Sequence, residues 1–189
     1  IKRGGKAIIV DINVDALDKS AVELRPEATV FSCNVADLES VKELADKAWA
    51  VHGQVDLIFN NAGVIGKSAP IVNTDSNDFK WVMDVNVGGV WNGCHVFGKR
   101  FIEQGSPAHI INTGSENSVG VPNPNIAPYT ASKHAVLAIS DVLREELPDF
   151  ISHPEVEELQ EAPLPSPSIW KTVFISGGRK DKVSKGDIA

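Results

Sequence analysis

Short apolar runs alternate with helix-spaced segments along the first 150 residues, and this alternation constrains the fold more than any other feature. The runs that are typical of strands span 7–10, 29–33, 55–59 and 109–112. Apolar residues recur at helical spacing over 14–24, 38–52, 79–101 and 129–147. We expect Pro148 to end the last of these helices. The alternation predicts an α/β fold, a doubly wound, Rossmann-like parallel sheet in a single domain.

The alternation stops after Phe150, and the sequence of residues 151–189 is irregular. Its prolines leave no room for a central strand before residue 169. We expect a short helix over 155–161 and one more strand over 172–175. We therefore assign residues 1–189 to one domain, with 151–189 as a substrate-side region and C-terminal tail.

Charge and composition exclude several function classes. The net charge is −7, and no block of lysine and arginine stands out, so we expect no nucleic-acid partner. No apolar run approaches the ~18 residues that cross a bilayer, so we expect no membrane partner. The five histidines show no metal-ligand spacing, which predicts no metal site. Cys33 and Cys94 are single and far apart, which favours a cytoplasmic location.

Tyr129 and Lys133 stand four positions apart at the start of a helix-spaced run. Helical geometry places such residues on one face, so we expect a phenol and an ammonium side by side. A fixed positive charge favours the phenolate, and such a pair could act as a general acid or base near neutral pH. The same pair could also be a surface contact that stabilises the helix by about 0.2–0.5 kcal/mol.

Polar and small residues follow the strand-like runs, where sheets of this type bind ligands. Asp11 ends the first run, and a carboxylate there can bind both hydroxyls of an adenosine ribose. It would repel a 2′-phosphate, which favours NAD over NADP. The third run ends in Asn-Asn-Ala-Gly (60–63), where a ligand can approach the backbone, and Ser115 follows the fourth. A simple turn role is an alternative for each of these residues.

Together these elements resemble one protein family, the short-chain dehydrogenases/reductases. The match consists of Asn60-Asn61-Ala62-Gly63, Asn86 within Val-Asn-Val, Ser115, and the pair Tyr129 and Lys133. Their order and approximate spacing match the family over residues 4–150. The resemblance implies a dinucleotide-binding, catalytic domain. It also implies an oxidoreductase that transfers a hydride between NAD and a small secondary alcohol or ketone substrate.

The resemblance assigns catalytic roles to four residues. Tyr129 would be the general acid or base, and Lys133 would hold the nicotinamide ribose and favour the phenolate. Ser115 would donate a hydrogen bond to the reacting oxygen. Asn86 would hold a water in a proton relay to Lys133, the alternative being a solvent-facing side chain near Gly88.

The resemblance also predicts binding residues. Besides Tyr129 and Lys133, the cofactor would contact Asp11, Asn34, Val35, Asn61, Ala62 and Gly63. The substrate would contact Ser115, Asn117 and Tyr129, with Val119 and Ile126 as further candidates. A loop-packing role is equally open for Asn117, Val119 and Ile126.

Two family features are missing from these 189 residues. One is an opening strand with the turn Thr-Gly-x-x-x-Gly-x-Gly, and the other is a strand followed by Pro-Gly after the helix of Tyr129. Asn34 also stands where the family more often has aspartate. A sheet without its central strand would leave unpaired backbone groups that cost about 1–3 kcal/mol each, against a total stability of about 5–15 kcal/mol. We therefore expect the natural protein to contain these pieces.

The family implies a homodimer or homotetramer that forms through the helices of Asn86 and Tyr129. Trp81, Trp91 and Phe97 could lie in that contact, although core burial is the expectation we favour. Two other functions stay open. One is a dinucleotide-binding sensor or scaffold without catalysis, and the other is an NAD-using epimerase or dehydratase with the same tyrosine and lysine.

Overall fold

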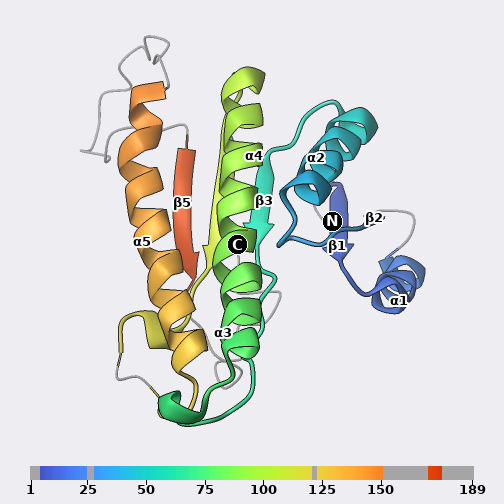
Figure 1. The fold of residues 1–189 in the computed structure, drawn as a ribbon. Helices are drawn as coiled ribbons and strands as arrows, with labels where there is room; N and C mark the ends of the chain where they lie inside the picture. The colour runs from blue at the N-terminus through green and yellow to red at the C-terminus, as the bar shows by residue number, and fades with distance from the viewer. Residues whose placement is uncertain (1–4, 25–27, 121–122, 151–169, 176–189) are drawn as a thin grey trace.

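The computed structural model describes residues 5–24, 28–120, 123–150 and 170–175, and its strands and helices alternate as expected (Figure 1). The strands are β1 (Ala7–Asp11), β2 (Ala28–Ser32), β3 (Leu57–Asn60), β4 (Ala108–Thr113) and β5 (Trp170–Ile175). The helices are α1 (Val14–Leu24), α2 (Leu38–His52), α3 (Ser76–Met83), α4 (Gly89–Gln104) and α5 (Ala127–Phe150). A π-helical segment, η2 (Asp84–Gly88), joins α3 to α4, and two 3-10 turns are η1 (Ile71–Asn73) and η3 (Glu116–Ser118).

All strand pairs in the described structure are parallel, which confirms the α/β fold class. β1 pairs with β2 in one sheet, and β3, β4 and β5 form a second sheet in that order. Within the described ranges β1 and β3 do not pair with each other, and Leu57 and Phe59 on β3 are more than two-fifths exposed. The expectation of an opening strand stays a prediction. β5 confirms the expected strand near 172–175, whereas the helix expected over 155–161 lies outside the described residues.

α2 begins and ends where local chemistry predicts. The Asp37 carboxylate accepts a hydrogen bond from the Glu39 backbone N–H, which caps the first turn. Gly53 ends the helix at a φ of 78°, a conformation that side chains disfavour. The apolar face of α2, with Val41 and Ala45 buried, packs into the core.

Two helix predictions need correction. The helix expected over 79–101 begins at Ser76, because Asp75 caps it, and the π-helical segment η2 interrupts it. The interruption is a change of hydrogen-bond pattern within one continuous helical rod (Figure 1). α5 continues to Phe150 rather than stopping before Pro148. A proline in the last turn removes only one backbone hydrogen bond, so the helix can continue for two more residues.

An aromatic cluster joins α2 to α4 in the core. The ring centroid of Trp49 lies 5.7 Å from that of Phe97 and 5.8 Å from that of Phe101. The expectation of core burial is thus right for Phe97 and wrong for Trp81 and Trp91, which are 50% and 58% exposed. Trp91 lies on the outer stripe of α4, away from the positions that pack on the sheet.

The expected oligomer stays a prediction. None of the helices within the described ranges is long and apolar enough to cross a membrane.

A buried polar chain ties the ends of β3 and β4 to α5. The Asn60 amide donates to Asn112 Oδ1 at 2.8 Å, and the Asn112 amide donates to Ser140 Oγ at 2.9 Å. Asn112 and Ser140 are fully buried. α4 passes directly over this chain at Gly93, where a Cβ would lie 2.0 Å from Asn60 Oδ1. The fold therefore requires a residue without a side chain at position 93.

Replacing Gly93 with alanine should destabilise the protein by about 1–3 kcal/mol or more, because Asn60 is held by Asn112 and cannot move aside freely. Chemical denaturation monitored by circular dichroism measures this change. Gly98→Ala, in the same helix, is the matched control, since its Cβ would meet only Ile110 Cδ1 at 3.9 Å. Equal stabilities of the two variants would contradict the argument.

Candidate active site

Ser115 lies two residues beyond the end of β4 and is 2% exposed. Its hydroxyl oxygen accepts hydrogen bonds from the Asn117 backbone N–H at 3.2 Å and from Asn117 Nδ2 at 3.3 Å. These bonds cap the 3-10 turn η3. Ser115 therefore has the turn role that sequence analysis gave as an alternative, in addition to its position at the strand end. The strand and the turn together hold the hydroxyl at the carboxyl edge of the sheet.

α5 brings Tyr129 and Lys133 to the same edge. The Lys133 ammonium donates a hydrogen bond to the Thr113 carbonyl oxygen at 2.7 Å, which ties α5 to the last residue of β4. Lys133 Nζ lies 5.8 Å from the centroid of the Tyr129 ring, so the expected phenol–ammonium pair is present. Lys133 is only 5% exposed, and burial lowers the pKa of its ammonium below the usual value. The alternative of an exposed surface pair is therefore wrong.

Asn86 is 1% exposed within η2, which confirms that its side chain faces inward. Its Oδ1 accepts from the Val64 backbone N–H at 2.7 Å, and its Nδ2 donates to the Val64 carbonyl at 2.8 Å. The same Nδ2 donates to Ser132 Oγ at 2.9 Å, and Ser132 in turn donates to the Tyr129 carbonyl at 2.7 Å. Asn86 thus connects the loop after β3 to the first turns of α5.

The loop after β3 contains three predicted cofactor residues, Asn61, Ala62 and Gly63, all exposed at the carboxyl edge of the sheet. The Thr113 hydroxyl donates to Asn61 Oδ1 at 2.9 Å, so this loop is held to the end of β4. A Cβ at Gly63 would lie 3.8 Å from Lys133 Nζ. The glycine therefore keeps the space beside the ammonium free of a side chain.

Asp11 is the last residue of β1, and Asn34 and Val35 follow β2 in the first sheet. Asp11 is exposed, and its Oδ1 accepts from the Asn13 backbone N–H at 2.8 Å, so it forms the turn that precedes α1. Asn34 is exposed, and its Oδ1 accepts from the backbone N–H two residues on. Val35 packs against Gly89, where a Cβ would be 2.7 Å from Val35 Cγ2. These three residues lie at the carboxyl ends of the neighbouring strands β1 and β2, and in the described structure none of them makes a hydrogen bond to Tyr129 or Lys133.

Sequence reasoning missed two residues of this region, Ser132 and Thr113. Ser132 has a detectable signal, because Ser132, Val136 and Ser140 are spaced four apart and all are fully buried on α5. A polar residue in an apolar helical stripe needs a partner, which here is Asn86. Thr113 has no such signal, since its backbone carbonyl makes the contact with Lys133.

The residues present fit the ribose portions of a dinucleotide. Lys133 Nζ uses one of its three N–H donors on Thr113, which leaves two donors for ribose hydroxyls in the space beside Gly63. Asp11 Oδ2 accepts no hydrogen bond from any described residue, so that carboxylate oxygen is available to an adenosine ribose. Within the described ranges no glycine-rich turn precedes α1 to bind a pyrophosphate.

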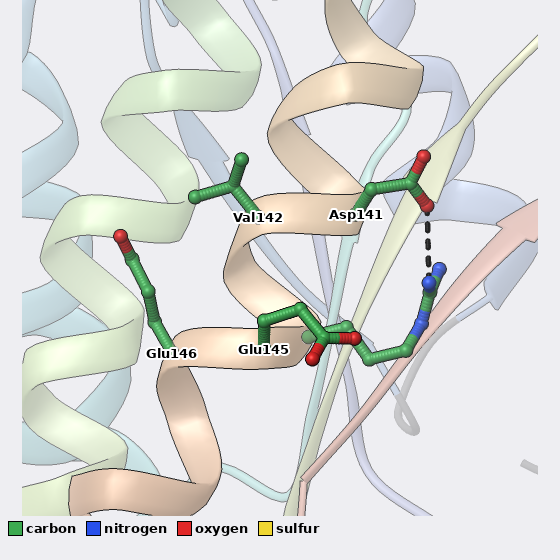
Figure 2. A pocket seen from close by; sticks show the side chains of 5 residues that line it. Asp141, Val142, Glu145 and Glu146 are labelled. Atoms are coloured by element: carbon green, nitrogen blue, oxygen red, sulfur yellow. Dashed lines mark hydrogen bonds and ion pairs between the residues drawn. The ribbon is translucent and has the colours of Figure 1, made fainter.

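The described residues do not support two other candidate sites, a metal site and a depression on α5. No group of histidine, cysteine, aspartate or glutamate there could hold a metal ion. A shallow depression on α5 is lined by Asp141, Val142, Arg144, Glu145 and Glu146 (Figure 2). All five residues come from one helix and are exposed, and Arg144 pairs with Asp141 at 3.0 Å. This depression is a solvated helix face rather than a place where strand ends converge.

Comparisons with known proteins agree with this geometry. A family model described as short chain dehydrogenase matches residues 1–151. The probable oxidoreductase EphD of Mycobacterium tuberculosis is 35% identical over 149 residues, which cover 77% of this chain and 25% of that protein.

Several of the similar solved structures carry a bound dinucleotide, two of which are compared with this chain. A short chain dehydrogenase/reductase from Burkholderia phymatum in complex with NAD has a TM-score of 0.77 at 30% identity, and the match covers 90% of this chain and 56% of that chain. A gluconate 5-dehydrogenase from Burkholderia cenocepacia in complex with NADP and tartrate has a TM-score of 0.69 at 29% identity, with coverages of 76% and 56%. The chain therefore spans between 25% and 56% of the length of these relatives.

Proposed function

This chain belongs to the short-chain dehydrogenases, and we propose that it transfers a hydride between a nicotinamide dinucleotide and a secondary alcohol or ketone. The observation that carries this proposal is the buried Lys133 ammonium beside the Tyr129 ring. Taking a lysine out of water is costly, and a merely structural lysine would reach solvent. The Thr113 carbonyl instead holds it beside the phenol and Gly63.

In the proposed reaction Tyr129 exchanges a proton with the substrate oxygen. In the oxidative direction the phenolate takes the hydroxyl proton, and in the reductive direction the phenol returns it to the carbonyl oxygen. Lys133 stabilises the phenolate and binds the ribose hydroxyls of the cofactor. The bound nicotinamide ring would supply the hydride chemistry.

Ser115 and Asn86 support this proton transfer. The Ser115 hydroxyl donates a hydrogen bond to the reacting oxygen, where negative charge develops. Asn86 joins η2 to the loop after β3 through Val64 and to the start of α5 through Ser132. We assign the water of the proton relay to Lys133 to the second acceptor position of Asn86 Oδ1. Because the proton leaves through this relay, the phenolate can form again in each turnover.

A panel of secondary alcohols offered with NAD or NADP tests the proposed function. We expect absorbance of the reduced nicotinamide to appear with at least one alcohol and to disappear when the matching ketone is added in excess. Dinucleotide binding with no turnover across the panel would favour the non-catalytic sensor. Interconversion of substrate without net reduced cofactor would favour the epimerase.

Asp11 is proposed to set a preference for NAD through its carboxylate at the end of β1. Asp11→Ala should lower the ratio of kcat/KM for NAD to that for NADP by about tenfold, which corresponds to about 1.4 kcal/mol. Steady-state kinetics with both cofactors measures this ratio.

Asp11→Asn separates charge from turn geometry, because its Oδ1 can still accept from the Asn13 N–H. The asparagine variant should lose the preference as the alanine variant does. An unchanged ratio in both variants would show that Asp11 is only a turn residue.

A further inference from the structure

Asn117 contacts Ser115 directly and is almost sealed from solvent, with 4% of its surface exposed. Its Nδ2 donates to Ser115 Oγ, and its Oδ1 accepts from the Asn123 backbone N–H and from Asn123 Nδ2, each at 3.3 Å. The Thr130 hydroxyl approaches the same Oδ1 at 3.5 Å. Both ends of the Asn117 amide therefore have a partner in the protein, and the substrate contact expected from sequence stays a prediction.

The orientation of the Asn117 amide follows from its neighbours. The backbone N–H of Asn123 can only donate, so the atom that faces it must be the carbonyl oxygen Oδ1. The amino group Nδ2 then necessarily points at Ser115 Oγ. A flipped amide would place two N–H donors against each other at Asn123 and would leave no donor for Ser115.

This orientation leaves the Ser115 hydroxyl in the role of a donor. A hydroxyl oxygen has two acceptor positions and one hydrogen. The Asn117 backbone N–H and Nδ2 occupy both acceptor positions. No described residue accepts the Ser115 hydrogen, although Ser115 is 2% exposed and an unpaired buried donor is costly. The hydrogen is therefore free to bond to a ligand oxygen.

We infer that Asn117 is a positioning residue that orients the Ser115 hydroxyl as a hydrogen-bond donor toward the reacting oxygen of the substrate. The inference rests on the proposed function. It assigns Asn117 a role through Ser115 rather than through contact with the substrate. Fixing the hydroxyl before the reaction avoids reorientation when charge develops on the substrate oxygen, which is where preorganised donors have their effect.

The test replaces Asn117 by aspartate in the purified protein, assayed with an alcohol found in the panel above. The introduced carboxylate would keep an oxygen for Asn123 and Thr130, but its other oxygen would accept the Ser115 hydrogen instead of donating to Ser115 Oγ. Asn117→Asp should therefore lower kcat by about 10–100-fold while the dissociation constant of the cofactor changes by less than about twofold.

Asn123→Ala is the matched control, because it removes one contact of Asn117 Oδ1 and keeps the backbone N–H. Its kcat should stay within about twofold of the wild type. A double-mutant cycle adds the decisive readout. In a Ser115→Ala background, Asn117→Asp should cause almost no further decrease in kcat, because the hydroxyl that Asn117 orients is no longer present.

Three outcomes overturn the inference. The first is a kcat for Asn117→Asp equal to that of Asn123→Ala. The second is the same fold loss with and without the Ser115 hydroxyl. If the aspartate variant does not fold by circular dichroism, Asn117→Ala is measured in the same cycle, and additivity there counts equally against the inference. The third outcome is a wild type that is inactive with the whole panel, which removes the proposed function as well. The first two outcomes leave the proposed function standing, so failure of the inference and failure of the proposed function are distinguishable.

Discussion

Replacing Tyr129 with phenylalanine should lower kcat by about 10³-fold or more and leave cofactor affinity nearly unchanged. The substitution removes only the phenol oxygen and keeps the ring beside Lys133, so the packing of the first turns of α5 is preserved. Tyr129 is the single tyrosine of the sequence, and no other phenol can replace it. Initial rates and a fluorescence titration with the reduced cofactor measure the two quantities.

His134→Ala is the control for this substitution, because His134 lies on the same helix but is exposed, and its ring nitrogen bonds to the Thr130 carbonyl at 3.0 Å. It should retain nearly full activity. Activity of Tyr129→Phe comparable to that of His134→Ala would remove Tyr129 from the mechanism and, with it, the proposed proton transfer.

Replacing Lys133 with methionine should lower kcat/KM by about 10²–10³-fold without a matching loss of stability. The phenolate loses its neighbouring positive charge, and the ribose hydroxyls lose two donors. The free energy of unfolding near neutral pH should change by less than about 1.5 kcal/mol, because the lost hydrogen bond to Thr113 is offset by the relief of a buried charge. Kinetics and denaturant unfolding on one preparation give both values.

The pH dependence of stability gives a separate measurement of the same lysine. Burial lowers the pKa of Lys133 in the folded protein, so between that pKa and the ordinary value of 10.5 the unfolded chain binds more protons. Stability contributed by this group therefore rises as the pH increases through that window and is lost as the pH falls through it. Lys133→Met should lack this component.

Lys47→Met is the charge-matched control, since Lys47 is exposed and pairs with Glu43 at 3.7 Å on the surface of α2. It should leave both kcat/KM and the pH dependence of stability nearly unchanged. A Lys133→Met variant that behaves like Lys47→Met would contradict the roles assigned to the buried ammonium.

Local spacing was sufficient to predict much of the fold. Apolar runs at strand spacing predicted β1 to β5 to within about two residues at each boundary. Helical spacing over 38–52 predicted the limits of α2, where Asp37 caps the first turn and Gly53 ends the helix. The pair Tyr129 and Lys133 was predictable for the same reason, because a helix places residues four apart on one face whatever surrounds it. The π-helical segment was not predictable, since its hydrogen-bond pattern depends on what packs against Asn86 and Gly89.

By itself, the sequence determined the α/β class, the order of the elements and the types of side chain at each strand end. The tertiary structure alone decided which of these side chains meet. The bond from Asn86 to Ser132 joins residues 46 positions apart, and the bond from Asn60 to Asn112 joins residues 52 positions apart. The tertiary structure also buried the Lys133 ammonium against the Thr113 carbonyl, 20 positions away, and brought the Thr130 hydroxyl to Asn117 Oδ1, 13 positions away. Such contacts depend on how helices and strands pack in space, and helical or strand periodicity carries no information about partners that distant in the chain.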